Sequence, residues 1–346
     1  MKTEDVIKYL KEYDGRPLKL MEVCGTHTAS IFKNGIRSLI SPKIKLISGP
    51  GCPVCVTPTA YIDRVLDYAA RPDHMVYTFG DMMKVPGKCG SLSDMKGKGI
   101  NVGMMYSPFE VIEKAAANPE KTYVIAAVGF ETTAPIYALA VQEAAKRGIK
   151  NLKLVTALKT VIPALSWICE NQDDIDGFIC PGHVSVIIGS GVYEALAEKY
   201  NKPFVVAGFE PEHLLAVIYD IVRQIECGKS DVKNLYKNAV RDEGNAKAIK
   251  AINEYFETGE ATWRGLGSIP DSGLYLKPEY AEYDGGSRGL DSDMELPKGC
   301  SCGSVIVGKL NPNECPMFGK SCTPLHPYGP CMVSAEGACG IWYRSI

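Results

Sequence analysis

Two cysteines lie two residues apart in the stretch Ile47-Ser-Gly-Pro-Gly-Cys52-Pro-Val-Cys55-Val-Thr-Pro58. The preceding apolar run, 43–48, predicts a strand, and Thr57-Pro58 is typical of a helix start, with a capping hydroxyl and a proline at the first helical position. Unpaired backbone N–H groups at a helix start favour a thiolate over a thiol. The sequence therefore predicts that Cys52 and Cys55 form either a redox-active dithiol or a metal-binding pair.

A third cysteine lies in a similar local setting. The segment Cys24-Gly-Thr-His27-Thr follows a predicted strand at 18–23 and precedes a helical pattern at 29–40. His183, in Pro181-Gly-His183-Val-Ser, follows a predicted strand at 177–180. Because the carboxyl ends of parallel strands meet at one edge of a sheet, Cys24 and His183 are expected near the cysteine pair. For either histidine, a structural hydrogen-bonding role competes with a functional one.

The last 47 residues hold six of the thirteen cysteines of the chain: Cys300, Cys302, Cys315, Cys322, Cys331 and Cys339. Thiolates are soft ligands suited to zinc or to iron–sulfur clusters. A loop-rich segment without a core of its own needs such a bound metal or cluster as a cross-link to be ordered. The spacings fit neither a zinc ribbon nor a zinc finger. They favour a [4Fe–4S] cluster over structural zinc, and two cysteines are then left over.

Two glutamates follow predicted strands in similar four-residue motifs, Val128-Gly-Phe-Glu131 and Ala207-Gly-Phe-Glu210. Each is expected to accept a hydrogen bond from helix-start N–H groups, a structural role that competes with a catalytic one. Two similar α/β halves would explain why the two motifs are alike, and chance similarity is the alternative.

The composition excludes several classes of function. With 38 basic and 40 acidic side chains among 346 residues, no bulk charge points to nucleic acid or to a membrane surface. The apolar runs are too short to cross a bilayer, and the first residues carry no apolar signal core, so a cytoplasmic location is expected. Neither a phosphate loop nor a dinucleotide fingerprint is present.

Alternation of strand-like and helical segments predicts the α/β class. Strands are expected at 18–23, 43–48, 75–79, 100–104, 123–128, 152–157, 177–180 and 203–207. Helices are expected at 5–13, 29–40, 59–69, 108–117, 134–147, 163–170, 191–200, 212–227 and 233–256, the last with an interruption at Gly244. Residues 259–299 are expected to form ordered loop or short strands that wrap other domains, with partial disorder as the alternative. The expected division is an N-terminal helix with the Cys24 segment (1–45), a first α/β domain (46–148), a second (149–228), and a helical and loop region with the cysteine tail (229–346).

Taken together, these motifs resemble the HypD family of hydrogenase maturation proteins over essentially the whole chain. The resemblance implies two similar parallel-sheet α/β domains around a central cleft, with a small loop-rich [4Fe–4S] domain at the C-terminus. It implies a scaffold with redox activity, rather than a conventional turnover enzyme, on which the Fe(CN)2CO group of [NiFe] hydrogenase is assembled. The implied partners are a HypC-type chaperone and a HypE-type cyanide donor, with the chain a monomer on its own.

The resemblance also assigns residues. Cys24, Cys52 and Cys55 match the essential thiols, with Cys24 and Cys55 as the iron ligands, and His183 and Glu336 match polar residues near the iron. The implied cluster ligands are Cys300, Cys315, Cys322 and Cys339, with Cys302 as a rival for the first position and Cys331 outside the set.

Two other functions remain open from the residues. One is a [4Fe–4S]-dependent thiol–disulfide reductase of the ferredoxin:thioredoxin reductase type, in which Cys52 and Cys55 exchange with a protein thiol. The other is a plain iron–sulfur adaptor protein.

Overall fold

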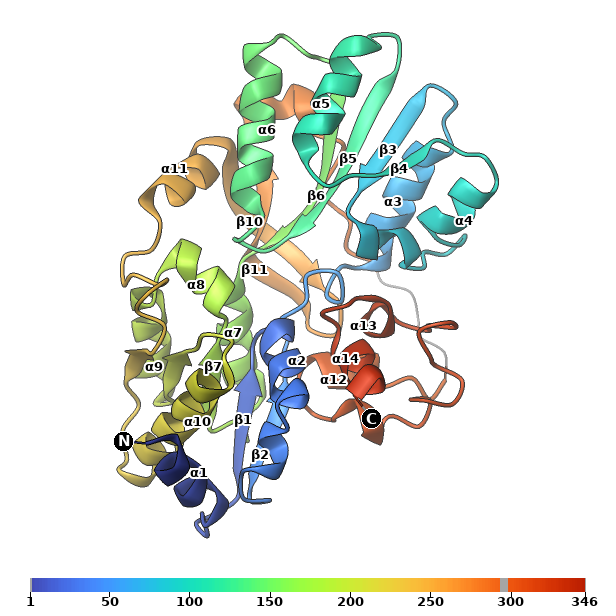
Figure 1. Cartoon of the computed structure of the whole chain (residues 1–346). Coiled ribbons are helices and arrows are strands. Elements are labelled where there is room, and N and C mark those ends of the chain that lie inside the picture. The colour runs from blue at the N-terminus through green and yellow to red at the C-terminus, as the bar shows by residue number, and fades with distance from the viewer. Residues whose placement is uncertain (1, 293–297, 346) are drawn as a thin grey trace.

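The computed structural model describes residues 2–292 and 298–345. Two β-sheets with helices on their faces lie end to end, and the C-terminal cysteine-rich segment packs beside the junction between them (Figure 1). The α/β class is confirmed, and parallel pairing dominates both sheets. Within the described residues, no helix is long and apolar enough to span a bilayer.

The first sheet is entirely parallel and has the order β2-β1-β7-β8-β9. Its strands are β1 (Leu18–Glu22), β2 (Ile44–Ser48), β7 (Gly177–Cys180), β8 (Phe204–Val206) and β9 (Val232–Asn234). Its helices are α1 (Thr3–Lys11), α2 (Gly25–Lys33), η1 (Ile36–Ser38), α7 (Val161–Asn171), α8 (Gly182–Ile188), η3 (Gly191–Tyr193), α9 (Glu194–Tyr200) and α10 (Pro211–Glu226).

The second sheet has the order β10-β11-β6-β5-β3-β4, in which β11 and β10 add an antiparallel hairpin to four parallel strands. Its strands are β3 (His74–Thr78), β4 (Val102–Met104), β5 (Thr122–Gly129), β6 (Leu152–Lys159), β10 (Phe256–Trp263) and β11 (Gly267–Leu276). Its helices are α3 (Thr59–Ala69), η2 (Gly80–Lys84), α4 (Leu92–Gly97), α5 (Pro108–Ala117), α6 (Ala134–Lys146), α11 (Ala246–Tyr255) and η4 (Pro278–Tyr283).

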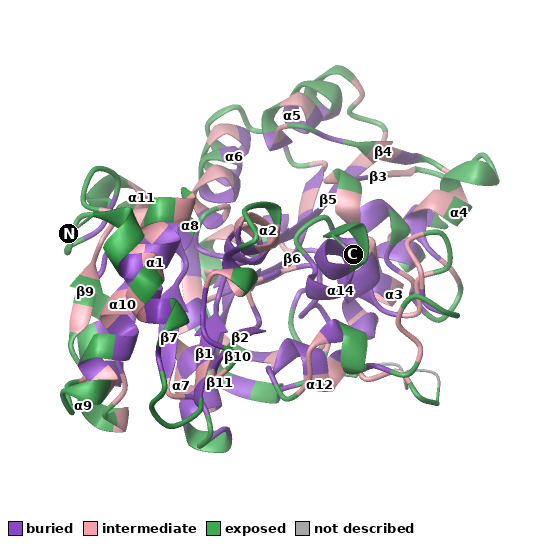
Figure 2. Cartoon of the chain, turned by 60° about the horizontal axis from the view of Figure 1, so that its bottom comes forward, coloured by how far each residue is buried: buried purple, intermediate pink, exposed green. Residues whose placement is uncertain are grey.

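Alternate residues of each central strand enter different cores, as the two-residue period of a strand requires. In β5, Val124 and Ala126 join the core that includes α3, whereas Ile125 and Ala127 join the core that includes α5 and α6. The first of these cores continues across the junction into the first sheet and into the cysteine tail. Figure 2 shows this buried interior beneath exposed helix faces.

The chain passes between the sheets three times, after β2, after β6 and after β9. Consequently β1 pairs with β7, although the predicted segments 1–45 and 149–228 are far apart in sequence. β6 pairs with β5 across the predicted boundary at residue 148. Residues 49–58, with both cysteines of the pair, form the first passage and therefore lie at the junction.

The tail is made of short helices: α12 (Cys302–Ile306), η5 (Pro312–Glu314), α13 (Pro330–Val333) and α14 (Ala338–Ser345). Helix α14 packs on α2, where the rings of Phe32 and Trp342 meet edge to face at 4.7 Å between centroids. The tail is thereby fixed to the first sheet.

Most predicted elements are confirmed, and three predictions are wrong. The helix expected over 29–40 is instead α2, which ends at Lys33, and η1, because Gly35 between them takes a left-handed conformation with φ of 61°. The helix expected over 233–256 is instead β9, a turn, and α11, because Gly244 takes a left-handed conformation with φ of 75° and a continuous helix cannot pass through it. Pro58 is the N-cap of α3 rather than its first residue, and the Thr57 hydroxyl donates to the Pro53 carbonyl at 2.8 Å. The short strands expected within 259–299 are parts of the β10–β11 hairpin, and residues 293–297 of that range lie outside the described residues.

Candidate metal and redox site

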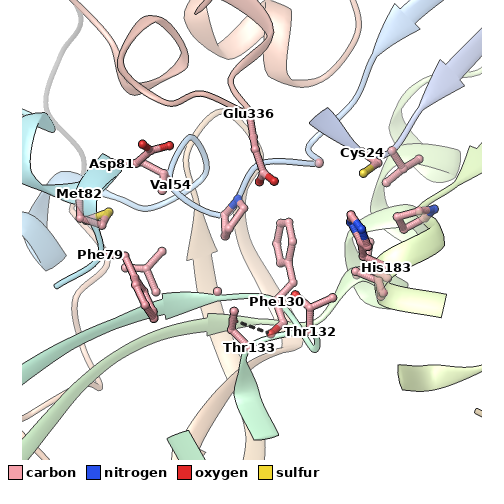
Figure 3. A pocket seen from close by; sticks show the side chains of 18 of the residues that line it. Cys24, Val54, Phe79, Asp81, Met82, Phe130, Thr132, Thr133, His183 and Glu336 are labelled. Atoms are coloured by element: carbon pink, nitrogen blue, oxygen red, sulfur yellow. Dashed lines mark hydrogen bonds between the residues drawn. The ribbon is translucent and has the colours of Figure 1, made fainter. Parts of the chain in front are cut away.

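A pocket of about 350 Å³ lies at the junction of the two sheets. Its walls come from the turns after β1, β5 and β7, from η2 and from the tail, which contribute Cys24, Phe130, His183, Asp81 and Glu336 respectively. Figure 3 shows these side chains around one space. The structure thus brings together three of the predicted site residues, Cys24, His183 and Glu336.

Cys24 is the residue immediately before α2 and is buried. Burial raises the pKa of its thiol, and the charge of Glu336 adds to this, although the backbone N–H groups of His27 and Thr26 act in the opposite direction. Desolvation therefore outweighs the helix start, and Cys24 is held as a thiol that must lose its proton to bind a metal.

Two glycines allow the three cysteine-bearing segments to touch. A Cβ atom on Gly51 would lie 2.5 Å from the backbone nitrogen of Cys24, and a Cβ on Gly25 would lie 2.3 Å from the carbonyl oxygen of Glu336. Any side chain at these places would collide with backbone rather than with a movable side chain. The glycines in the Cys24 and Cys52 motifs therefore have a packing role as well as a turn role.

Sequence reasoning missed Asp81. Its carboxylate accepts hydrogen bonds from the Ser334 hydroxyl at 2.8 Å and from the Ala335 backbone N–H at 2.9 Å. The Ser334 hydroxyl in turn accepts from the backbone N–H of Glu336 at 3.2 Å. Desolvation raises the pKa of Glu336, and the nearby Asp81 adds to the effect. The only signal in the sequence is an acid in the turn after a predicted strand, which is a weak one.

The two predicted histidines have different environments. The ring of His183 lines the pocket and stacks on Phe209 at 4.2 Å between centroids. His27 is fully buried, its ring centroid lies 5.0 Å from that of Phe209, and its Nε2 lies 3.3 Å from the Ala207 carbonyl oxygen. Burial lowers the pKa of His27 to about 4 and also lowers that of His183, so both rings are neutral at neutral pH. His27 supports the pocket wall rather than lining it.

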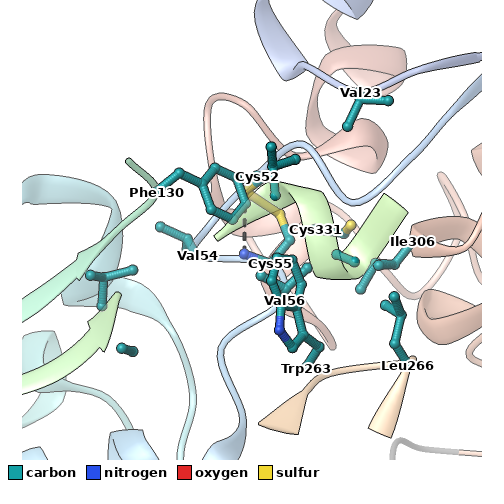
Figure 4. Packing of buried hydrophobic residues seen from close by; sticks show 14 of the residues in the cluster. Val23, Cys52, Val54, Cys55, Val56, Phe130, Trp263, Leu266, Ile306 and Cys331 are labelled. Atoms are coloured by element: carbon teal, nitrogen blue, oxygen red, sulfur yellow. Dashed lines mark hydrogen bonds between the residues drawn. A yellow bond between two sulfur atoms is a disulfide. The ribbon is translucent and has the colours of Figure 1, made fainter. Parts of the chain in front are cut away.

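Cys52 and Cys55 are joined as a disulfide and are buried under Phe130, Val54 and Val56 (Figure 4). Neither sulfur atom lines the pocket that Cys24 faces. The pair instead borders a small neighbouring cavity of about 10 Å³, whose lining includes Glu336 and Cys331. The disulfide therefore lies directly behind the pocket, between it and the tail.

All six tail cysteines line one small cavity, together with Val305, Phe318, Gly329 and Met332. Cys331 borders both this cavity and the one beside the disulfide. The sulfur of Cys315 accepts from the Ser301 N–H at 3.4 Å, and that of Cys322 accepts from the Tyr328 N–H at 3.5 Å. The predicted convergence of the tail cysteines is therefore present as a shared cavity.

The tail thiols differ in their electrostatics. Desolvation raises the pKa of Cys300 to about 11. Desolvation also raises the pKa of Cys322 above its ordinary value. For Cys315 desolvation acts in the same direction, but hydrogen bonds from backbone N–H groups outweigh it and leave the pKa lowered. A hydrogen bond with Cys331, followed by burial, places the pKa of Cys302 well above its ordinary value. Cys315 is thus the tail thiol most inclined to ionise among those with a resolved shift.

The two echoed glutamates are not equivalent. Glu131 is buried, and its Oε1 accepts from the Val161 N–H at the start of α7 at 2.8 Å, which confirms the expected helix-start bond. Glu210 is exposed and makes no side-chain cap to α10, so that prediction is wrong for it. Across residues 2–292 and 298–345, no three His, Cys, Asp or Glu side chains are already arranged to hold a metal ion.

The fold and the site define a cysteine-rich α/β protein with a thiol-bearing pocket between two sheets and a second cavity lined by cysteines. A family model described as "HypD: Hydrogenase formation hypA family" matches residues 2–345. The chain is 42% identical over 334 residues to the hydrogenase maturation factor HypD of Escherichia coli (strain K12), a match that covers 95% of this chain and 89% of that protein. It is also 42% identical over 337 residues to HypD of Rhodobacter capsulatus, with the same coverage of the two chains. The chain therefore belongs to the HypD family of hydrogenase maturation factors.

Proposed function

We propose that this hydrogenase maturation factor is the scaffold on which the Fe(CN)2CO group of [NiFe] hydrogenase is assembled, with the junction pocket as the place of assembly. The observation that carries the proposal is the meeting of Cys24, His183 and Glu336, from three distant segments, around one pocket of about 350 Å³. The iron is cargo here, and low-spin iron that carries cyanide and CO is soft enough to be held by thiolates.

Cys24 and Cys55 are the proposed iron ligands. Because Cys55 borders the neighbouring cavity and not the pocket that Cys24 lines, the proposal requires its side chain to turn toward Cys24 once the disulfide is open. Since Cys55 is bonded to Cys52, the disulfide must first be opened, which takes two electrons from an external reductant and two protons and gives two thiols. Cys24 must also lose its proton before it binds iron. Glu336 is close enough to raise the Cys24 pKa, and its own raised pKa suits it to accept that proton.

The tail is proposed to hold a [4Fe–4S] cluster through Cys300, Cys315, Cys322 and Cys339. The donor chemistry fits, because six thiols face one cavity and two sulfur atoms already accept backbone N–H bonds as cluster thiolates do. The cavity, about 10 Å³ as it stands, must widen by rotation of cysteine side chains. Such a cluster supplies electrons one at a time.

The hydrogen bond with Cys331 and burial raise the pKa of Cys302 well above its ordinary value, which keeps Cys302 protonated and favours Cys300 as the first ligand. For Cys331 the bond with Cys302 lowers the pKa, but a hydrogen bond with Cys339 and burial outweigh it and leave the pKa raised. Cys331 then remains a free thiol that borders both the cluster cavity and the cavity of the disulfide. This arrangement connects the two redox groups through the chain's own residues. HypC-type and HypE-type partners complete the proposal as chaperone and cyanide donor, acting on a chain that is monomeric on its own in the cytoplasm.

Infrared spectroscopy tests the proposal on protein purified anaerobically with its HypC-type partner. Cyanide and CO stretching bands are expected for the wild type, and C24A is expected to lose them while it keeps the cluster absorbance. Cys227 is exposed at the end of α10, away from the pocket lining, so C227A is the matched control and should keep the bands. Bands that survive in C24A would refute the place of the iron.

The cluster assignment is tested separately. C322A is expected to bleach the absorbance of the cluster, and C89A, a change at another exposed cysteine, should leave it unchanged. Full retention of iron and sulfide in C322A would remove Cys322 from the ligand set.

A second candidate function, a cluster-dependent thiol–disulfide reductase, is favoured by the disulfide and by the position of Cys331 beside it. It predicts that anaerobic thiol titration of C52S shows no reducible disulfide and that the variant no longer reduces a protein disulfide substrate. Wild-type protein without any such reductase activity would rule this function out.

A further inference from the structure

Asp81 reaches the tail from the second sheet. It lies in η2, directly after β3, and its neighbours Met82 and Met83 anchor this turn in the core. The same carboxylate oxygen, Oδ2, accepts both hydrogen bonds from the tail, at 2.8 Å from the Ser334 hydroxyl and at 2.9 Å from the Ala335 N–H. One oxygen atom of the second sheet therefore holds two successive residues of the tail.

The first sheet holds the same segment of the tail from another side. Helix α14 packs on α2, and a Cβ atom on Gly25 would lie 2.3 Å from the carbonyl oxygen of Glu336. Figure 3 shows Glu336 between Asp81 and Cys24, all three of which line the junction pocket. The position of Glu336 therefore depends on contacts with both sheets.

The backbone of Glu336 decides where its carboxylate lies. Among the residues that the structure describes, this carboxylate has no hydrogen bond or ion pair of its own. The Glu336 N–H donates to the Ser334 hydroxyl at 3.2 Å, and that hydroxyl donates to Asp81. Because Ser334 is buried, water does not readily replace the acceptor that Asp81 supplies. Loss of Asp81 would therefore release the backbone that carries the carboxylate.

We infer that Asp81 is a positioning residue of the junction pocket, which fixes Glu336 near Cys24 by accepting hydrogen bonds and not by its charge. The inference rests on the proposed function, in which Glu336 takes the proton of Cys24. Since Oδ2 accepts both bonds and Oδ1 takes part in neither, the amide oxygen of an asparagine can accept the same two bonds. Asparagine should therefore replace Asp81, whereas alanine should not.

Amide hydrogen exchange of the full chain tests the positioning without any bound iron. D81A is expected to speed exchange at Ala335 and Glu336 about tenfold or more, because bonds to a charged acceptor are lost. D81N should keep most of the protection at both amides. Asp67 is an exposed aspartate on α3 outside the pocket lining, so D67A is the matched control and should leave both amides unchanged.

S334A provides a second variant that leaves Asp81 in place. It removes only the hydroxyl, so it should speed exchange at Glu336 and preserve the bond from the Ala335 N–H to Asp81. Equal protection of Glu336 in S334A and in the wild type would overturn the inference. So would unchanged exchange at both amides in D81A, or exchange in D81N as fast as in D81A.

Infrared spectroscopy of the complex with the HypC-type partner tests whether Asp81 acts through Glu336. D81A is expected to lose most of the cyanide and CO band intensity, and D81N to retain it. The double variant D81A/E336Q should match E336Q, because a residue that acts only by positioning Glu336 adds nothing once that carboxylate is gone.

A double variant that loses more band intensity than E336Q would overturn the inference, since it would show a structural role of Asp81 that is independent of Glu336. Absence of the bands in the wild type would refute the proposed function instead. The exchange measurements would then still decide whether Asp81 positions Glu336.

Discussion

Replacement of Glu131 by glutamine should change how the stability of the protein depends on pH. Glu131 is fully enclosed beside the junction pocket, where its Oε1 accepts from the Val161 N–H and its Oε2 has no partner. Desolvation raises its pKa from 4.5 to about 7, although backbone N–H groups act against this. Glutamine has nearly the same shape, keeps an oxygen for the Val161 bond and does not titrate.

The sign follows from the raised pKa of the folded state. The protonated carboxyl contributes its full stability below the unfolded pKa near 4.5, and this contribution is lost as the pH rises through about 7. The difference between 4.5 and about 7 corresponds to about 3 kcal/mol. The free energy of unfolding of E131Q minus that of the wild type should therefore increase by about 3 kcal/mol from near pH 4.5 to near pH 8.

Urea denaturation of both proteins from about pH 4.5 to about pH 8 measures this difference. Other buried groups that titrate in the range, such as His27, are present in both proteins and cancel. Glu210 is the exposed glutamate after β8, so E210Q serves as the matched control and should give a flat difference. A flat difference for E131Q as well would refute the claim that an enclosed carboxyl at this position is destabilising when ionised.

Three further predictions concern packing, charge and the tail. G51A should lower the free energy of unfolding by about 1–3 kcal/mol in urea denaturation, because the added Cβ would lie 2.5 Å from the Cys24 backbone nitrogen. Burial lowers the pKa of Lys159 from 10.5 to about 7, so the wild type loses stability as the pH falls through this range. As the pH falls from about 10 to about 7, K159M should therefore gain up to about 5 kcal/mol of stability relative to the wild type. A difference in free energy of unfolding between the two proteins that does not change with pH would refute this. D81A should speed amide hydrogen exchange at Ala335, because it removes the hydrogen bonds to Ser334 and Ala335.

The sequence by itself determined the local features of this protein. Apolar runs of strand length and helical periodicity placed most strands and helices, and turn residues placed Cys24 and His183 directly after β1 and β7. These features depend on neighbours in sequence, which is why pattern and turn chemistry suffice to predict them. Prediction failed where a local signal was weak: Gly244 ends a helical pattern, and Glu210, despite its echo of Glu131, points to solvent.

Only the tertiary structure decided which of these pieces meet. That β1 pairs with β7, that Asp81 holds the tail beside Glu336, and that Cys331 borders both cysteine cavities all depend on contacts between segments far apart in the chain. The pKa of Cys24 shows the physical reason. The position of Cys24 before a helix can be predicted from the sequence and favours a thiolate. The burial that keeps this thiol protonated comes from the packing of the whole fold around it.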